Sequence, residues 1–252
     1  MDVEVFKSVL IIGCNRGLGL ELVRYLLNVE KPPQFIFATC RDLDACSALK
    51  AYNVFWNKRK TKVKVLQLDV NNDSEIAAVV SNIEQDLAGV GLSVLINNAE
   101  RHTIKDLDTL CREDMRKTYE TNAVSPIMIA KAFRSILWSF VLQSSKDVQR
   151  ERNAVIVNIS SVMGSISCNK RGGQYPYRTS KAALNMATRC LSADFKENKI
   201  IVFSLHPRNV PNKMEKPLSY NITAPGIIKF ISTADISKSG GFYAYDGMPL
   251  PF

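Results

Sequence analysis

Long apolar runs are missing from this chain, and so is any feature of a secretory signal. No uninterrupted apolar stretch approaches the ~20 residues that a membrane-spanning helix needs. The first residues, MDVEVFKSVLIIG, carry Asp2 and Glu4 where a signal peptide would be basic, and they run directly into a glycine motif. We therefore expect a cytoplasmic protein with no membrane partner.

Cysteine and histidine do not occur at spacings that are typical of a metal site or a disulfide framework. The six cysteines are scattered without a Cys-x-x-Cys pair, and the chain has two histidines. Without a secretory signal, reduced thiols are the default. The sequence therefore predicts no metal site, and it assigns His102 and His206 surface or structurally satisfied roles.

Acidic residues are outnumbered: 33 Lys and Arg against 24 Asp and Glu give a formal net charge of +9. A basic surface can attract nucleic acid, a membrane or an anionic small molecule. The densest basic cluster covers residues 58–60 with Lys62 and Lys64, and no nucleic-acid-binding motif accompanies it. We expect a solvated loop there rather than a nucleic-acid partner, and a charge that helps to collect a phosphorylated cofactor.

Short runs of β-branched residues alternate with longer amphipathic stretches along the chain. The predicted strands cover 9–12, 35–39, 63–68, 94–96, 154–159 and 200–205, and the predicted helices 18–27, 44–50, 74–87, 114–142 and 177–196. Nearly continuous apolar strands are typical of a parallel sheet covered on both faces.

The least regular regions are 143–153, 165–176 and 207–238, and the tail 240–252 has room for a short final strand. No linker or repeat divides the chain. The sequence therefore predicts an α/β fold over residues 1–252, a single doubly wound Rossmann-type parallel sheet with helices on both faces.

A glycine-rich turn follows the first predicted strand, in VLIIGCNRGLGLEL at 9–22. Glycine at Gly13, Gly17 and Gly19 permits a tight turn and a close approach to a pyrophosphate, which the next helix attracts with its free N–H groups. Such turns also occur for purely steric reasons. The position in the first strand–helix unit favours dinucleotide binding.

The choice of dinucleotide can be read from charge. A carboxylate at the end of the second strand suits the ribose of NAD, whereas an arginine suits the 2′-phosphate of NADP. This chain has Arg41 there, Asp42 one place further, and Arg16 inside the glycine turn. Either arginine alone could be a surface charge, but the two together favour NADPH/NADP.

A phenol and an ammonium stand four residues apart at Tyr177 and Lys181, so they share one face of a helix. A cation beside a phenol lowers its pKa from ~10 and makes it a usable proton donor near neutral pH. The spacing is common, but here a strand ending in hydroxyls, AVIVNISS at 154–161, precedes it. A serine hydrolase centred on Ser161 is disfavoured because no Gly-x-Ser-x-Gly turn is present.

With these motifs the chain resembles the short-chain dehydrogenase/reductase family, and within it the sniffer-type carbonyl reductases. The matching segments are GCNRGLGLELV at 13–23, LDV at 68–70, NNA at 97–99, NAVSP at 122–126, NISSVMGSI at 158–166, YPYRTSKAALNMAT at 175–188, SLHP at 204–207 and GGFYAYDGMPL at 240–250.

The resemblance implies a role for each matching residue. Tyr177 would protonate a carbonyl oxygen, Lys181 would hold the cofactor ribose and lower the Tyr177 pKa, and Ser161 would bind the substrate oxygen. Asn122 would position a relay water. The implied cofactor contacts are Gly13, Asn15, Arg16, Gly17, Leu18, Gly19, Arg41, Asp69, Val70, Asn98, Ala99, Tyr177, Lys181, Pro207 and Val210.

Three positions depart from the family pattern. Glu100 and Arg208 stand where glycines are usual, and Asn212 stands where a threonine is usual. Two functions therefore remain. The first is an NADPH-dependent reductase of a small aldehyde, ketone or quinone, monomeric or homodimeric. The alternative is a dinucleotide-binding regulatory protein of the same fold with weak or lost turnover.

Overall fold

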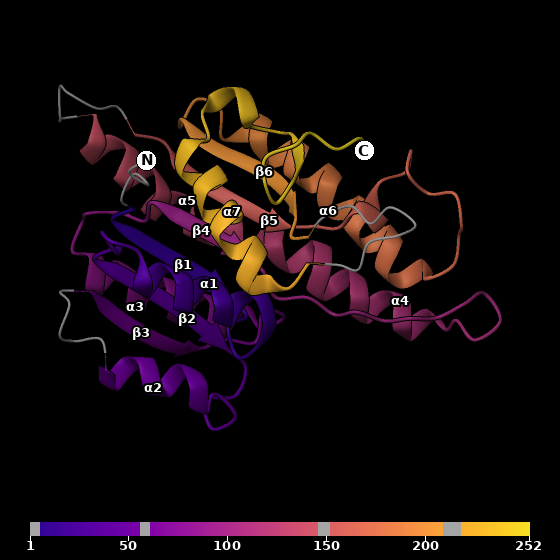
Figure 1. The fold of residues 1–252 in the computed structure, drawn as a ribbon, viewed down its shortest axis with the longest axis horizontal. Helices are drawn as coiled ribbons and strands as arrows, with labels where there is room; N and C mark the ends of the chain where they lie inside the picture. The colour runs from indigo at the N-terminus through magenta and orange to yellow at the C-terminus, as the bar shows by residue number, and fades with distance from the viewer. Residues whose placement is uncertain (1–5, 56–60, 146–151, 209–217) are drawn as a thin grey trace.

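Seven strands form one parallel sheet in the order β3-β2-β1-β4-β5-β6-β7 (Figure 1). The computed structural model describes residues 6–55, 61–145, 152–208 and 218–252. The strands are β1 Ser8–Ile12, β2 Phe35–Cys40, β3 Lys62–Gln67, β4 Val94–Asn97, β5 Ala154–Ile159, β6 Ile200–His206 and β7 Phe242–Ala244. The predicted fold class is confirmed, and the tail does supply a final strand.

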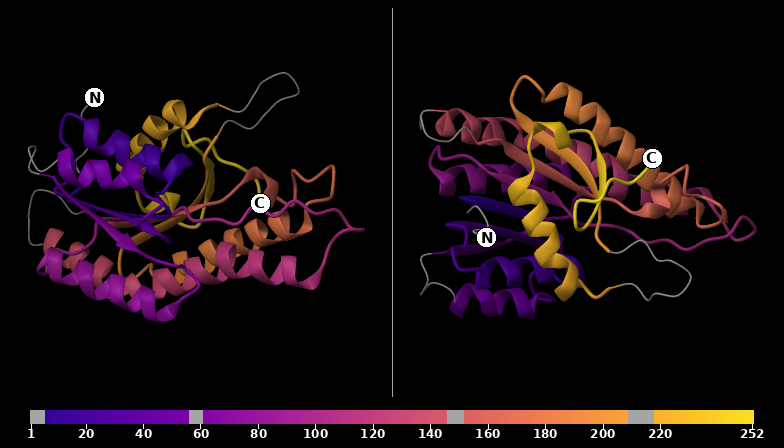
Figure 2. Two further views of the ribbon diagram at one scale, coloured as in Figure 1. Left: turned by 90° about the horizontal axis from the view of Figure 1, so that it is seen from below. Right: turned by 45° about the horizontal axis from the view of Figure 1, so that its top comes forward.

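Helices cover both faces of the sheet, as Figure 2 shows. They are α1 Gly17–Asn28, α2 Ser47–Phe55, α3 Asp73–Leu87, α4 Arg112–Tyr119, α5 Ser125–Ser144, α6 Tyr175–Asp194 and α7 Tyr220–Thr233. Alternate β1 residues point to opposite faces. Val9 and Ile11 pack with α1, α2 and α7 in one core, and Leu10 and Ile12 pack with α3, α5 and α6 in the other.

Helix α7 was not predicted, because residues 207–238 were read as irregular. Pro225 and Gly226 inside it are helix breakers by propensity. The signal that could have found the helix is a set of buried apolar residues at i, i+3, i+4 and i+7, namely Ala224, Ile227, Ile228 and Ile231. Burial of that face outweighs the hydrogen bond that proline removes.

The single long helix predicted over 114–142 is instead two helices joined by a π-helical turn, Glu120–Val124. The Ser125 N–H donates to Glu120 O, five residues back rather than four. Such turns insert one extra residue into a helix and often occur at functional sites. This one carries Asn122.

One segment among the described residues, Arg112–Ser144, is long and apolar enough to cross a membrane by length and composition alone. Half of its most apolar window is buried in the fold. Phe133, Leu137 and Phe140 of this segment pack in the second core. The segment therefore has the burial pattern of a core helix.

Part of the predicted basic cluster lies in the sheet. Lys62 and Lys64 on β3 both form ion pairs with Asp86 of α3, at 2.5 and 2.7 Å. Hydrogen bonds from the two lysines lower the pKa of Asp86. Residues 58–60 lie outside the described residues, so the solvated loop expected there stays a prediction.

A buried polar network joins the middle strands to α6. Asn97 Nδ2 donates to Asn158 Oδ1 at 2.8 Å, and Asn158 Nδ2 donates to Thr188 Oγ1 at 2.9 Å. Ser204 Oγ donates to the same Thr188 oxygen at 2.8 Å, and Thr188 donates onward to Leu184 O. Thr188 therefore satisfies two buried donors at once.

We expect Thr188→Val to lower the free energy of unfolding by about 1–3 kcal/mol, because valine matches threonine in size but leaves the Asn158 and Ser204 donors unpaired. Urea unfolding measures this. Thr233→Val, at an exposed position at the end of α7, is the control and should stay within about 0.5 kcal/mol of wild type. Equal effects of the two substitutions would contradict the role of the network.

Candidate functional site

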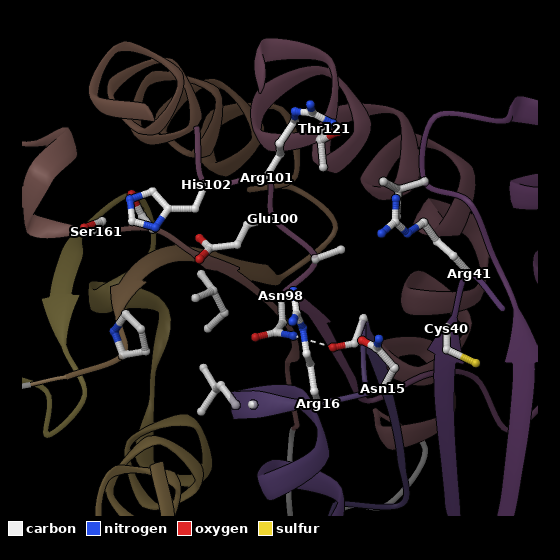
Figure 3. Close-up of a pocket in the computed structure, with 18 of the residues that line it drawn as sticks. Asn15, Arg16, Cys40, Arg41, Asn98, Glu100, Arg101, His102, Thr121 and Ser161 are labelled. Atoms are coloured by element: carbon white, nitrogen blue, oxygen red, sulfur yellow. Dashed lines mark hydrogen bonds between the residues drawn. The ribbon is translucent and has the colours of Figure 1, made fainter. Parts of the chain in front are cut away.

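A cleft of about 1120 Å³ opens where the carboxyl ends of β1, β2, β4, β5 and β6 meet (Figure 3). β1 and β4 are neighbours in the sheet, and the strand order reverses between them, which is where doubly wound sheets bind ligands. The predicted residues that line it are Gly13, Asn15, Arg16, Gly17, Leu18, Arg41, Asp69, Val70, Asn98, Ala99, Ser161, Tyr177 and Pro207. Val210 and Asn212 lie outside the described residues.

One end of the cleft is formed by the start of α1. The residue before the helix, Arg16, is extended and makes no side-chain cap, and the first turn has no acidic residue. At α3, by contrast, the Asn72 side chain accepts from Ser74 and Glu75 N–H. The uncapped N–H groups and the helix dipole attract an anion, so this end of the cleft fits the phosphates of a dinucleotide.

The glycine turn has a backbone that only glycine adopts readily. Gly13 and Gly17 have φ of +85° and +62°. A Cβ on Gly19 would lie 2.1 Å from Gly13 O, so Gly19 allows close packing within the turn instead of lining the cleft. Asn98 Nδ2 donates to Gly13 O at 2.7 Å and ties the turn to the end of β4.

Two arginines line the same cleft, Arg16 from the glycine turn and Arg41 from the end of β2 (Figure 3). Asp42, the carboxylate that would compete with a cofactor phosphate, accepts hydrogen bonds from Asp44 N–H and Ala45 N–H at 2.8 and 3.4 Å. Its charge is therefore partly engaged in a turn. The same turn explains why α2 begins at Ser47 rather than at Asp44.

Tyr177 and Lys181 lie one turn apart on α6, with 6% and 1% of their surfaces exposed. Lys181 Nζ donates to Ile159 O at the end of β5, at 2.8 Å. Ser161 follows that strand, and its Oγ accepts from Met163 N–H and starts a 3-10 turn, Val162–Gly164. The structure therefore brings the predicted tyrosine, lysine and serine together.

Asn122 does not line the cleft among the described residues. Its Oδ1 accepts from Arg101 N–H at 2.8 Å, and its Nδ2 donates to Arg101 O and Ser180 Oγ, each at 3.0 Å. The side chain thus fixes the segment after β4 against α6. The water relay expected of Asn122 stays a prediction.

Glu100 has contacts that the sequence did not reveal. Its Oε2 accepts a hydrogen bond from Tyr177 Oη at 3.0 Å and forms an ion pair with Lys181 Nζ at 2.8 Å. Its side chain is 37% exposed, and Figure 3 shows it reaching into the cleft between His102 and Asn98. The sequence signal was its position in place of a family glycine, but not its partners.

The expectation that Lys181 lowers the Tyr177 pKa is wrong for this structure. Burial raises the pKa of Tyr177 above its ordinary value, and the Glu100 carboxylate raises it further, while a hydrogen bond from Ser161 acts the other way. The physical reason is that a buried phenol beside a carboxylate loses both solvation and a favourable charge environment for its ionised form.

Two further contacts were missed. The exposed His102 ring lies 4.3 Å from the Tyr177 ring, so this histidine is part of the site. The Arg208 guanidinium lies 4.3 Å from the ring of Tyr220, the first residue of α7, and both line the cleft. Among the described residues, no group of His, Cys, Asp or Glu could hold a metal ion.

Known proteins share this fold and sequence. A family model described as short chain dehydrogenase matches residues 7–222. The carbonyl reductase Sniffer of D. melanogaster has a TM-score of 0.90 and 37% identity, over 98% of this chain and 100% of that one. An NADPH-bound carbonyl reductase from chicken fatty liver has a TM-score of 0.86 and 31% identity, over 98% and 94%. An uncharacterised oxidoreductase of Schizosaccharomyces pombe is 26% identical over 98% of both chains.

Proposed function

The chain belongs to the short-chain dehydrogenase family, and from this premise we propose that it is an NADPH-dependent reductase of a small aldehyde, ketone or quinone. The family resemblance predicted from the sequence is confirmed, and with it an oxidoreductase whose structural neighbours are carbonyl reductases. The observation that carries the finer proposal is the cleft itself. One end of the cleft has an uncapped helix N-terminus and two arginines. The other end is lined by Tyr177 and Ser161, and Lys181 lies buried behind that lining, in contact with Glu100.

NADPH, when bound, supplies a hydride to the carbonyl carbon. The glycine turn, Arg16 and Arg41 would hold its phosphates, as the charge and the free N–H groups of this end favour. Ser161 would donate a hydrogen bond to the carbonyl oxygen. Tyr177 would give that oxygen its phenolic proton, which completes the alcohol and leaves a phenolate beside Lys181.

Turnover is tested directly with purified protein, NADPH and a panel of aldehydes, ketones and quinones, followed by nicotinamide absorbance. Steady consumption of NADPH with alcohol formation is the expected result. The contact of Glu100 with Tyr177 and Lys181 favours a second candidate, a dinucleotide-binding regulatory protein without turnover. Tight NADPH binding with no consumption on any carbonyl would select this alternative.

Cofactor preference is tested by reversing one charge. We expect Arg41→Asp to weaken NADPH binding roughly 10- to 100-fold, because a hydrogen bond to a charged group contributes about 1.5–3 kcal/mol. NADH, which lacks the 2′-phosphate, should bind as before or slightly better. Titration calorimetry with both nucleotides measures the difference.

The matched control is Arg24→Asp, which changes the net charge equally but lies outside the cleft, on α1 beside Glu21. It should leave both affinities unchanged. If Arg41→Asp weakens NADPH and NADH alike, Arg41 does not recognise the phosphate.

The proposal treats residues 1–252 as one cofactor-binding domain, acting in the cytoplasm as a monomer or a homodimer. The exposed free thiols of Cys111, Cys168 and Cys190 suit a reducing compartment. Two lysines of the basic cluster, Lys62 and Lys64, already pair with Asp86, so their charges need no nucleic-acid partner.

A further inference from the structure

Glu100 sits where the two side chains most needed for the proposed reaction meet. One carboxylate oxygen, Oε2, contacts both Tyr177 Oη and Lys181 Nζ. Lys181 has Ile159 O as a second acceptor, and only 1% of its surface is exposed. The ammonium is therefore held between a carboxylate and a carbonyl, with little solvent to replace either.

The carboxylate in this cluster is charged. Burial acts to raise the pKa of Glu100, but the Lys181 charge and the hydrogen bonds from Lys181 and Tyr177 outweigh it and keep this pKa below its ordinary value. The nearby His102 acts in the same direction. A charge-assisted contact of this kind is stronger than one between neutral groups.

A polyol and this carboxylate would compete for the same atoms. Hydroxyl groups of a cofactor ribose bind an ammonium and a phenol by accepting and donating hydrogen bonds, which are the bonds that Glu100 Oε2 now takes up. The carboxylate would also repel the phosphates of a dinucleotide in the same cleft. Glu100 is 37% exposed toward solvent, so its side chain has space to turn away.

We propose that Glu100 is an internal competitor for the cofactor: its carboxylate holds Tyr177 and Lys181 when no cofactor is bound, and the nicotinamide ribose binds by displacing it. Glu100 is thus a positioning residue that sets cofactor affinity by acting through Lys181 and Tyr177. This inference rests on the proposed function, since it concerns the same cleft.

The backbone on both sides of Glu100 is held in place by contacts of its neighbours. Asn122 binds both the N–H and the carbonyl of Arg101, the residue next to Glu100. Ala99, on the other side, packs against Gly13, where a Cβ would lie 2.9 Å from Ala99 Cα. Displacement therefore requires rotation of the Glu100 side chain and no movement of the strand end.

The test compares Glu100→Gly and Glu100→Gln with wild type by titration calorimetry with NADPH. We expect binding to tighten on the order of tenfold in Glu100→Gly, equivalent to about 1.4 kcal/mol. Glu100→Gln keeps the size of the side chain and removes its charge, so it should tighten binding by a smaller factor. Glu113→Gln removes a charge that pairs with Lys117 at 3.3 Å outside the cleft, and it should change nothing.

A second readout needs no cofactor. Ultraviolet titration of the free protein, with the Tyr177→Phe spectrum subtracted, follows ionisation of Tyr177 alone. Removing the carboxylate should lower this pKa, because the Glu100 charge and its hydrogen bond from Tyr177 both disfavour the phenolate. The Glu113→Gln protein should titrate as wild type does.

The outcomes separate the two proposals. If neither Glu100 variant binds NADPH more tightly and the Tyr177 titration does not move, Glu100 is no competitor and the inference is overturned. If no protein binds NADPH but the Tyr177 titration shifts as expected, the proposed cofactor fails while the hold of Glu100 on Tyr177 stands. Tighter binding without carbonyl turnover supports the competitor and rejects the reductase.

Discussion

Replacing Tyr177 with phenylalanine should lower kcat for carbonyl reduction by about 10²- to 10⁴-fold, the range that a positioned general acid contributes. The substitution removes the phenolic proton and the hydrogen bond to Glu100, but it keeps the ring that packs against His102. The ion pair of Glu100 with Lys181 is also retained. Steady-state kinetics with a carbonyl substrate measure the loss, and NADPH titration should still show binding.

Tyr175→Phe is the matched control, because Tyr175 lies on the same helix two residues earlier with 37% of its surface exposed. It should keep wild-type kcat. Equal activity of Tyr177→Phe and wild type would exclude Tyr177 as the acid. Thermal unfolding of both variants checks that the fold is intact.

Gly19→Ala should have the largest effect at the other end of the cleft. Alanine normally stabilises a helix by about 1 kcal/mol relative to glycine. Here its Cβ would lie 2.1 Å from Gly13 O and 2.7 Å from Asn98 Nδ2, so the glycine turn must move. We expect the free energy of unfolding to fall by about 1–3 kcal/mol, as in other overpacked sites. NADPH binding should fall below detection, because the turn no longer presents its N–H groups.

Gly89→Ala is the control that distinguishes the steric clash at position 19 from the loss of a glycine alone. Gly89 has φ of +86° and no atom within 4 Å of an added Cβ, and it does not line the cleft. Alanine there is strained by about 1–2 kcal/mol, yet NADPH should bind as it does to wild type. Normal NADPH binding by Gly19→Ala would show that the turn tolerates the extra atom.

The strands and most helices were predictable because their signals are local. β1, β4 and β5 are buried on both faces, so they are almost continuously apolar, with one polar residue each: Ser8, Asn97 and Asn158. The capping residue Asn72 marks the start of α3. The placement of Tyr177, Lys181 and Ser161 was predictable because the first two share a helix face and Ser161 follows a strand end, whereas their catalytic roles stay predictions. Helix α7 failed because Pro225 and Gly226 masked an apolar pattern that was present.

The features of the site that could not be predicted are contacts between residues far apart in the sequence. Glu100 and Tyr177 are 77 positions apart, and their contact follows from β4 and α6 lying on the same cleft. No local sequence pattern indicates that Glu100 and Tyr177 are in contact. The direction in which the Tyr177 pKa shifts could therefore not be predicted from the Tyr–Lys spacing. The tilted ring contact of His102 with Tyr177 and the cation–π contact of Arg208 with Tyr220 have the same origin.

The π-helical turn at Glu120–Val124 also sets the phase of everything that follows it in α5. Deleting its extra residue would rotate the downstream helix by about 100° relative to α4. Ile136 would move from the core to the exposed place of Ser135, and the exposed Trp138 and Leu142 would move into the buried places of Leu137 and Val141. The turn that carries Asn122, which binds Arg101, is therefore also the turn that keeps α5 in phase with the sheet. An insertion or deletion in this turn would therefore disturb the core and the cleft together.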